Sequence, residues 1–130
     1  MGDAKSWVHD VFHATPKPSP VDGLIEPDVD IAARDLFYGV GGKKLVPRSD
    51  VGYRFLEKDT SGFSDNFDIE DPSGRRYDAK SGHEAKTEVA ASRLLWAVGF
   101  HQPAVYHLRE WKMAGGPDAG VMPEARFRYE

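Results

Sequence analysis

Hydrophobic and polar residues alternate in three short runs between residues 53 and 80, and this period of two predicts consecutive β-strands. The first run, Tyr53 to Lys58, places Tyr53, Phe55 and Glu57 on one side of a strand. A turn signal at residues 59–62 leads to a second run, Phe67 to Glu70. Another at residues 71–74 leads to a third, Arg75 to Lys80.

The stretch after the third strand predicts a helix. Ser81 and Glu84 have the spacing of a capping box, residues 84–98 are rich in helix-forming residues, and Gly99 suits the C-terminal cap. The helix is expected to bury one apolar stripe, formed by Ala91, Leu95 and Val98.

Two further strands are expected beyond the helix. Residues 105–111 have strand character, residues 115–117 form a turn, and alternation resumes at Ala125, Phe127 and Tyr129 near the end of the sequence. Together these elements predict an α+β fold: an antiparallel sheet with one main packed helix.

The first 27 residues are expected to form an extension and a Pro-rich linker, separate from a compact region at 28–130. Residues 6–14 place Trp7, Val8, Val11 and Phe12 at helical spacing, and residues 15–20 contain three prolines that end any helix. Within the compact region, Asp28 or Asp30 is expected to cap a short helix that runs to Phe37.

Composition and charge narrow the classes of function. The 130 residues carry a formal net charge of −4, which disfavours nucleic acid as the main partner. There is no cysteine, which excludes disulfides and thiol catalysis. No apolar run has the length of a membrane span, so no membrane partner is expected, and the compartment is unknown.

Lys80 and Glu88 are the strongest candidates for chemistry. A lysine that projects from a strand supplies a fixed cation for phosphate oxygens, and an acid on the next helix holds it in place. Glu88 precedes Ala91, Leu95 and Val98 at helical spacing and so shares their predicted stripe, where an acid needs a partner. The ordinary alternative is a solvated Lys80 and an exposed Glu88.

A second candidate is the turn at residues 60–64, whose amides and hydroxyls are suited to cradling phosphate oxygens. An ordinary hairpin is the alternative interpretation. The glycine-rich stretch 39–44 lacks the spacing of a phosphate-binding loop. The five histidines and the acids near residue 70 lack metal-ligand spacing, so no metal site is predicted.

The sequence from residue 35 to 112 resembles a group of uncharacterised bacterial proteins with a kinase-like fold. The matching stretches are DLFYGVGGKK at 35–44, YRFLEKDTSGFS at 53–64 and, most specifically, EVAASRLLWAVGF at 88–100 after the lysine strand. The lysine strand and its helix are also similar, more distantly, to those of HipA-type and phosphoinositide-type kinases.

The resemblance implies the amino-terminal lobe of a kinase-like phosphotransferase. Lys80 would contact the nucleotide phosphates, Glu88 would orient Lys80, and Ser61, Gly62 and Ser64 would lie in the phosphate-cradling turn. ATP and Mg²⁺ would serve only a complete two-lobe protein, because the relatives carry their catalytic aspartate in a second lobe. We therefore expect a lobe truncated at its C-terminus, inactive alone, with weak nucleotide binding.

The alternative function is a non-catalytic α+β protein-interaction module. In that case Trp7, Phe12, Trp96 and Trp111 would build an apolar docking face for a protein partner. Under the first hypothesis the partner is the missing C-terminal lobe.

Overall fold

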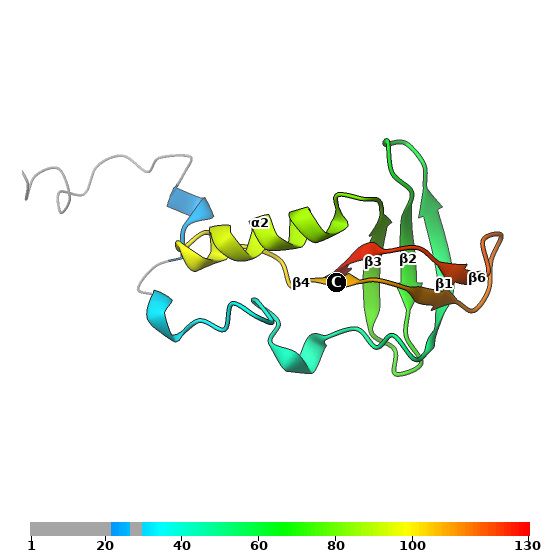
Figure 1. The fold of residues 1–130 in the computed structure, drawn as a ribbon, viewed down its shortest axis with the longest axis horizontal. Helices are drawn as coiled ribbons and strands as arrows, with labels where there is room; N and C mark the ends of the chain where they lie inside the picture. The colour runs from blue at the N-terminus through cyan, green and yellow to red at the C-terminus, as the bar shows by residue number, and fades with distance from the viewer. Residues whose placement is uncertain (1–21, 27–29) are drawn as a thin grey trace, which may run out of the picture.

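The computed structural model describes residues 22–26 and 30–130, and within them the fold is mixed α+β (Figure 1). One α-helix and a curled sheet of seven strands make up this part of the chain. The sheet order is β4-β7-β3-β2-β1-β5-β6. All neighbouring strands are antiparallel except β1 and β5, which are parallel. The predicted α+β class and single main helix are confirmed at this level.

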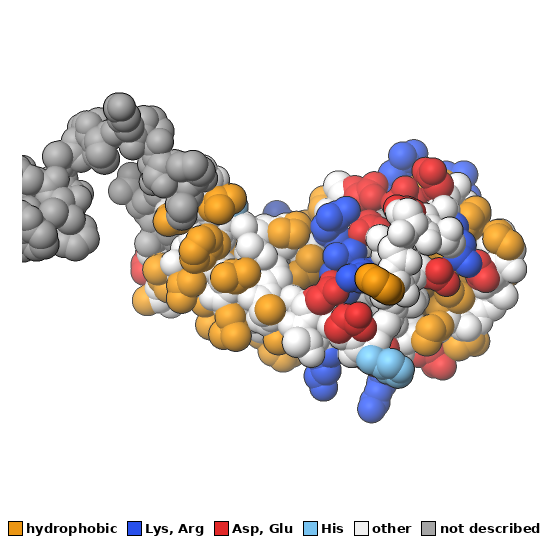
Figure 2. All heavy atoms as spheres, turned by 90° about the horizontal axis from the view of Figure 1, so that it is seen from above, with side chains coloured by type: hydrophobic (Ala, Val, Ile, Leu, Met, Phe, Trp, Pro, Cys, Tyr) orange, Lys and Arg blue, Asp and Glu red, His pale blue; other side chains and the backbone are white. Residues whose placement is uncertain are grey.

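The strands and the helix have these bounds: β1 Gly52–Asp59, β2 Asn66–Glu70, β3 Arg76–Ser81, α2 Ala85–Ala97, β4 Val105–Leu108, β5 Trp111–Met113, β6 Gly120–Met122 and β7 Ala125–Tyr129. Helix α2 follows β3 and contacts β4 and β7. In Figure 1 most of its length projects beyond the sheet. Figure 2 shows a matching division of the surface, with hydrophobic side chains over the helix and charged side chains over the sheet.

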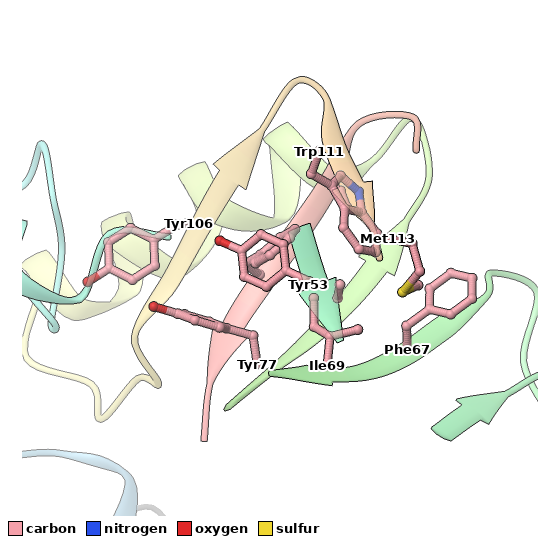
Figure 3. Close-up of a cluster of buried hydrophobic side chains, with 10 residues drawn as sticks. Tyr53, Phe67, Ile69, Tyr77, Tyr106, Trp111 and Met113 are labelled. Carbon is pink, nitrogen blue, oxygen red and sulfur yellow. The ribbon is translucent and has the colours of Figure 1, made fainter. Parts of the chain in front are cut away.

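The inner face of the sheet holds the core (Figure 3). Its side chains come from six of the strands, and aromatic rings dominate it. Trp111 lies edge-on to Phe127 with ring centroids 5.1 Å apart, and Tyr53 lies 5.2 Å from Phe127. Each such edge-to-face contact stabilises the fold by about 0.5–1.5 kcal/mol beyond the contribution of buried apolar area. The core residues are Tyr53, Phe67, Ile69, Tyr77, Ala79, Tyr106, Trp111, Met113, Ala125 and Phe127.

The first strand departs from its predicted alternation. The pairing of β1 with β2 shifts between Phe55 and Glu57, which marks a β-bulge. Because side chains alternate with a period of two, one extra residue moves every later side chain to the opposite face. Tyr53 is buried as predicted, but Glu57 is exposed and Lys58 instead lies over the Phe67 ring. The prediction that Glu57 shares the side of Tyr53 is wrong for this reason.

The β2–β3 turn forms where the sequence predicts it. The Asp71 carboxylate accepts hydrogen bonds from the Ser73 and Arg75 amides and from the Ser73 hydroxyl, at 2.7–2.9 Å. Gly74 adopts φ = 92°, a left-handed conformation that favours glycine. This local network fixes the register of the hairpin.

The predicted strand over residues 105–111 is two strands. The chain bends at Arg109 and Glu110, so β4 pairs with β7 while β5 pairs with β1 and β6. The short strand β6 was not predicted, because three residues give too little alternation to detect.

Helix α2 ends as predicted but begins differently. Phe100 N–H donates to Leu95 O and Gly99 N–H to Trp96 O, with Gly99 at φ = 105°, which is a Schellman motif. The capping-box prediction is wrong. Ser81 pairs with Ala125 as the last residue of β3, and Glu84 takes the cap position without a side-chain hydrogen bond.

The apolar stripe predicted for α2 is also wrong. Ala85 and Val89 are the buried residues of the helix, whereas Leu95 is 44% exposed and Val98 is 64% exposed. The helix is apolar on more than one side, and the face that packs is the one whose small residues allow close approach to β4 and β7. Hydrophobic periodicity in the sequence therefore does not show which of these faces is buried.

Among the described residues before β1, the helical segments are single turns of 3-10 helix. Asp30 caps the turn Ile31–Ala33, so the predicted helix reaching Phe37 does not form; Asp28 lies outside the described residues. Ile25 pairs with Phe100 beside the end of α2. The predicted helix at 6–14 and the Pro-rich linker at 15–20 also lie outside the described residues. No helix among the described residues has the length and apolar character needed to cross a membrane.

Candidate functional site

Lys80 lies on the outer, polar face of the sheet, near the end of β3. It pairs in register with Asn66 of β2 and Arg126 of β7. Its neighbours Ala79 and Tyr77 point into the core, so alternation directs Lys80 outward. The Lys80 side chain is 30% exposed, which leaves its ammonium group partly open to solvent.

Glu88 meets Lys80 across the junction between the sheet and the helix. Lys80 Nζ donates to Glu88 Oε1 at 2.6 Å, and Glu88 Oε2 lies 3.7 Å from the Arg126 guanidinium. Glu88 is in the first turn of α2, one residue before the buried Val89. That position places its carboxylate at the border of the packed face, where it reaches the sheet without full burial. The pairing predicted from the sequence is confirmed.

A second ion-pair cluster lies next to this pair and was not predicted. Asp78 Oδ2 accepts from Arg126 at 2.6 Å and lies 3.3 Å from Arg128. Asp78 is buried, and Arg126 Nε is buried without a hydrogen-bond partner among the described residues. The signal in the sequence was the alternation of Arg126, Phe127 and Arg128, but pairing β7 with β3 requires knowledge of the sheet order.

The turn at residues 60–64 connects β1 to β2 beside the same junction. Asp59 Oδ1 accepts from the Ser61 amide at 2.9 Å, so one of the cradle amides already has a partner. Ser64 is half-buried, and its hydroxyl lies 3.4 Å from the position that a Cβ would occupy at Gly82. Ser61 and Gly62 are exposed. The structure thus brings Ser64 to the β3–α2 junction and leaves Ser61 and Gly62 at the surface.

The outer face of β1 and β2 is acidic. A hollow of about 330 Å³ is lined by Glu57, Asp59, Asp68 and Asp78, together with Lys58, Asn66 and Arg128. Lys58 is also held by acids, at 2.9 Å from Asp118 and 3.6 Å from Asp65. Carboxylates on this wall would repel phosphate groups. Neither Lys80 nor Glu88 lines this hollow.

The glycine-rich stretch and the histidines, for which the sequence predicts no ligand, include residues that make structural contacts. Gly41 packs so closely against Tyr106 that a Cβ would lie 2.2 Å from the phenol oxygen. Glu124 accepts from His107 at 2.8 Å, and this contact lowers the pKa of the Glu124 carboxyl. Among the described residues, no group of three or more His, Asp or Glu side chains is arranged to hold a metal ion.

No protein-family model, curated protein or solved structure matches the chain. Function must therefore be inferred from the residues themselves.

Proposed function

We propose that this chain is the nucleotide-cradling amino-terminal lobe of a kinase-like phosphotransferase and is not catalytically complete by itself. The Lys80–Glu88 ion pair is the observation that carries the proposal. A strand lysine held by a helix glutamate is the arrangement that kinases use to place a cation on nucleotide phosphates. In this chain the two groups are 2.6 Å apart and 30% exposed, so the lysine is both oriented and reachable.

In this proposal each predicted residue has a defined task. The ammonium of Lys80 offsets phosphate charge, and the Glu88 carboxylate holds that ammonium in one position. Ser64 stands at the β3–α2 junction, while Ser61 and Gly62 are exposed residues of the same turn, with the Ser61 amide already bonded to Asp59. Phosphoryl transfer further requires metal ions and an acid that positions the acceptor. A carboxyl-terminal lobe would supply both, so ATP and Mg²⁺ belong to the two-lobe protein.

The acidic wall of β1 and β2 limits the affinity expected of this lobe alone. Asp68 and Asp78 share the outer face with Lys80, and Asp78 neutralises the two nearest arginines. Weak nucleotide binding is the consequence.

The alternative, a non-catalytic interaction module, is supported by a different observation. Leu94 of α2 is 67% exposed and Val98 is 64% exposed, which leaves an apolar helix face without a partner among the described residues. Trp111, which was expected on such a face, is instead buried in the core.

Titration of the protein with ATP and Mg²⁺ tests the proposal. Removing the Lys80 charge by Lys80→Ala should raise the dissociation constant by on the order of tenfold, the value of one charge-assisted contact. Lys112→Ala is the matched control, because Lys112 is an exposed lysine on β5. Equal dissociation constants for the two variants would remove the basis for the proposal.

A further inference from the structure

The outward face of α2 near its C-terminal end is apolar and uncovered in the described part of the chain. Leu94, Leu95 and Val98 are 67%, 44% and 64% exposed. Leu24 and Ile25, at 55% and 43% exposed, lie beside the same end of the helix. Figure 2 shows hydrophobic side chains gathered over this half of the molecule. An exposed apolar patch of this kind indicates a docking site.

The start of the described chain is anchored at this face. Glu26 N–H donates to Gly99 O at 2.8 Å, and His101 N–H donates to Leu24 O at 2.7 Å. Arg34 reinforces the anchor, because its guanidinium pairs with Glu26, donates to Trp96 O and lies over the Trp96 ring. The first described residues therefore lie next to the apolar face.

The preceding segment has the chemistry and the reach to cover the face. Trp7, Val8, Val11 and Phe12 fall on one side of a helix by their spacing. The nine residues at 13–21 connect Phe12 to the anchored segment, and this Pro-rich connection spans about 28 Å at 3.1 Å per residue. Helix α2 has 13 residues and is about 20 Å long at 1.5 Å per residue.

We propose that residues 7–12 dock in cis on the α2 face formed by Leu94, Leu95 and Val98. The occupant is a segment of this chain rather than a second molecule, because a short tether holds it at high effective concentration beside the face. The docking does not involve Lys80 or Glu88 and is independent of nucleotide binding. Its failure would leave the proposed function untouched.

Disulfide trapping tests this docking, since the natural chain has no cysteine. The variant Val11→Cys with Val98→Cys places one thiol on the segment and one on the face. In the control, Val11→Cys is combined with Lys86→Cys, an exposed position in the first turn of α2, about 18 Å along the helix from Val98 at 1.5 Å per residue. Oxidation at micromolar concentration should close the intramolecular disulfide on the order of tenfold faster in the first variant.

A charged residue in the face gives the second arm of the test. Leu95→Asp, added to the Val11→Cys and Val98→Cys variant, should slow closure to the rate of the Lys86→Cys control. Circular dichroism checks that each variant keeps its fold. Equal rates for the two cysteine pairs, predominant disulfide-linked dimers, or no effect of Leu95→Asp would each overturn the proposal.

Discussion

Lys80 Nζ and Glu88 Oε1 lie 2.6 Å apart, across a junction between a strand and the helix that follows it. Three residues without regular secondary structure, Gly82 to Glu84, reverse the chain between them. The pair is therefore set by local chain geometry as well as by charge.

The ion pair is expected to contribute little to stability. Both side chains are 30% exposed, and solvent screens such pairs, so Glu88→Gln should lower the free energy of unfolding by less than about 1 kcal/mol. Its effect on ATP affinity should be larger, because the lysine loses its orientation. Urea unfolding and ATP titration of the same variant compare the two effects. A strongly destabilised Glu88→Gln protein would point to a structural role for the pair instead.

Asp78 should oppose phosphate binding. Its carboxylate neutralises Arg126 and Arg128, so Asp78→Asn should lower the ATP dissociation constant by several-fold while it costs about 1–3 kcal/mol of stability. Titration below the melting temperature measures the first effect. Glu110→Gln is the control, because Glu110 is an exposed acid in the bend between β4 and β5. Unchanged or weaker binding by Asp78→Asn would count against phosphate binding at this face.

The turn at Asp71 should make stability depend on pH. Burial raises the pKa of the Asp71 carboxyl, but hydrogen bonds from Ser73 and Arg75 outweigh that effect and lower it below its ordinary value. A lowered pKa in the folded state means that the ionised group stabilises the fold above about pH 4, and that this contribution is lost as the pH falls through the folded-state pKa.

Asp71→Ala should therefore cost about 1–2 kcal/mol at pH 7 and progressively less below pH 4. Denaturant unfolding at pH 7 and at pH 3 measures the change. Asp71→Asn, which keeps an acceptor oxygen but no charge, is the control. A cost that stays constant between the two pH values would show that the charge of Asp71 is not involved.

Gly41 and Tyr106 should show energetic coupling. A Cβ at position 41 would lie 2.2 Å from the Tyr106 hydroxyl, so Gly41→Ala should cost about 1–3 kcal/mol. Tyr106→Phe alone should cost about 1 kcal/mol, because it removes the hydrogen bond to Gly42 O at 2.9 Å.

The double variant should be less destabilised than the sum of the two single variants, because Tyr106→Phe removes the atom nearest to the added Cβ, although Ala104 and Leu45 still lie close to it. Thermal or urea unfolding of all three variants gives the coupling. Gly115→Ala should be nearly neutral, since no atom outside its own neighbourhood lies within 4 Å of the added Cβ. Strict additivity would mean that the chain relaxes around position 41.

Local patterns in the sequence predicted most of the strands. The β2–β3 turn carries its own signal in Asp71 and Gly74, and the alternation on either side is regular. The bulge after Phe55 has no such signal, because it is set by the pairing of β1 with β2. The parallel contact of β1 with β5 likewise depends on residues distant in the sequence, whereas β6 is simply too short to show alternation.

The Lys80–Glu88 pair was predicted correctly from an argument that was partly wrong. Glu88 and Leu95 are seven residues apart and so share a side of α2, but that side is not the buried one: Leu95 is exposed, and the buried residues of the helix are Ala85 and Val89. An acid beside an apolar helix face needs a cation whichever face is buried, so this requirement still predicts the pair. The Asp78–Arg126–Arg128 cluster was out of reach, because it depends on the order β7-β3 in the sheet.

Nuclear magnetic resonance of the ¹⁵N-labelled protein during titration with ATP and Mg²⁺ tests the central claim most directly. If phosphates bind at the β3–α2 junction, the largest amide shifts should occur at Ser61, Gly62, Ser64 and Lys80, should saturate, and should need on the order of tenfold more ATP to reach half-saturation in Lys80→Ala. Shifts that gather elsewhere, or that reach half-saturation at the same ATP concentration in Lys80→Ala, would contradict nucleotide binding at this pair.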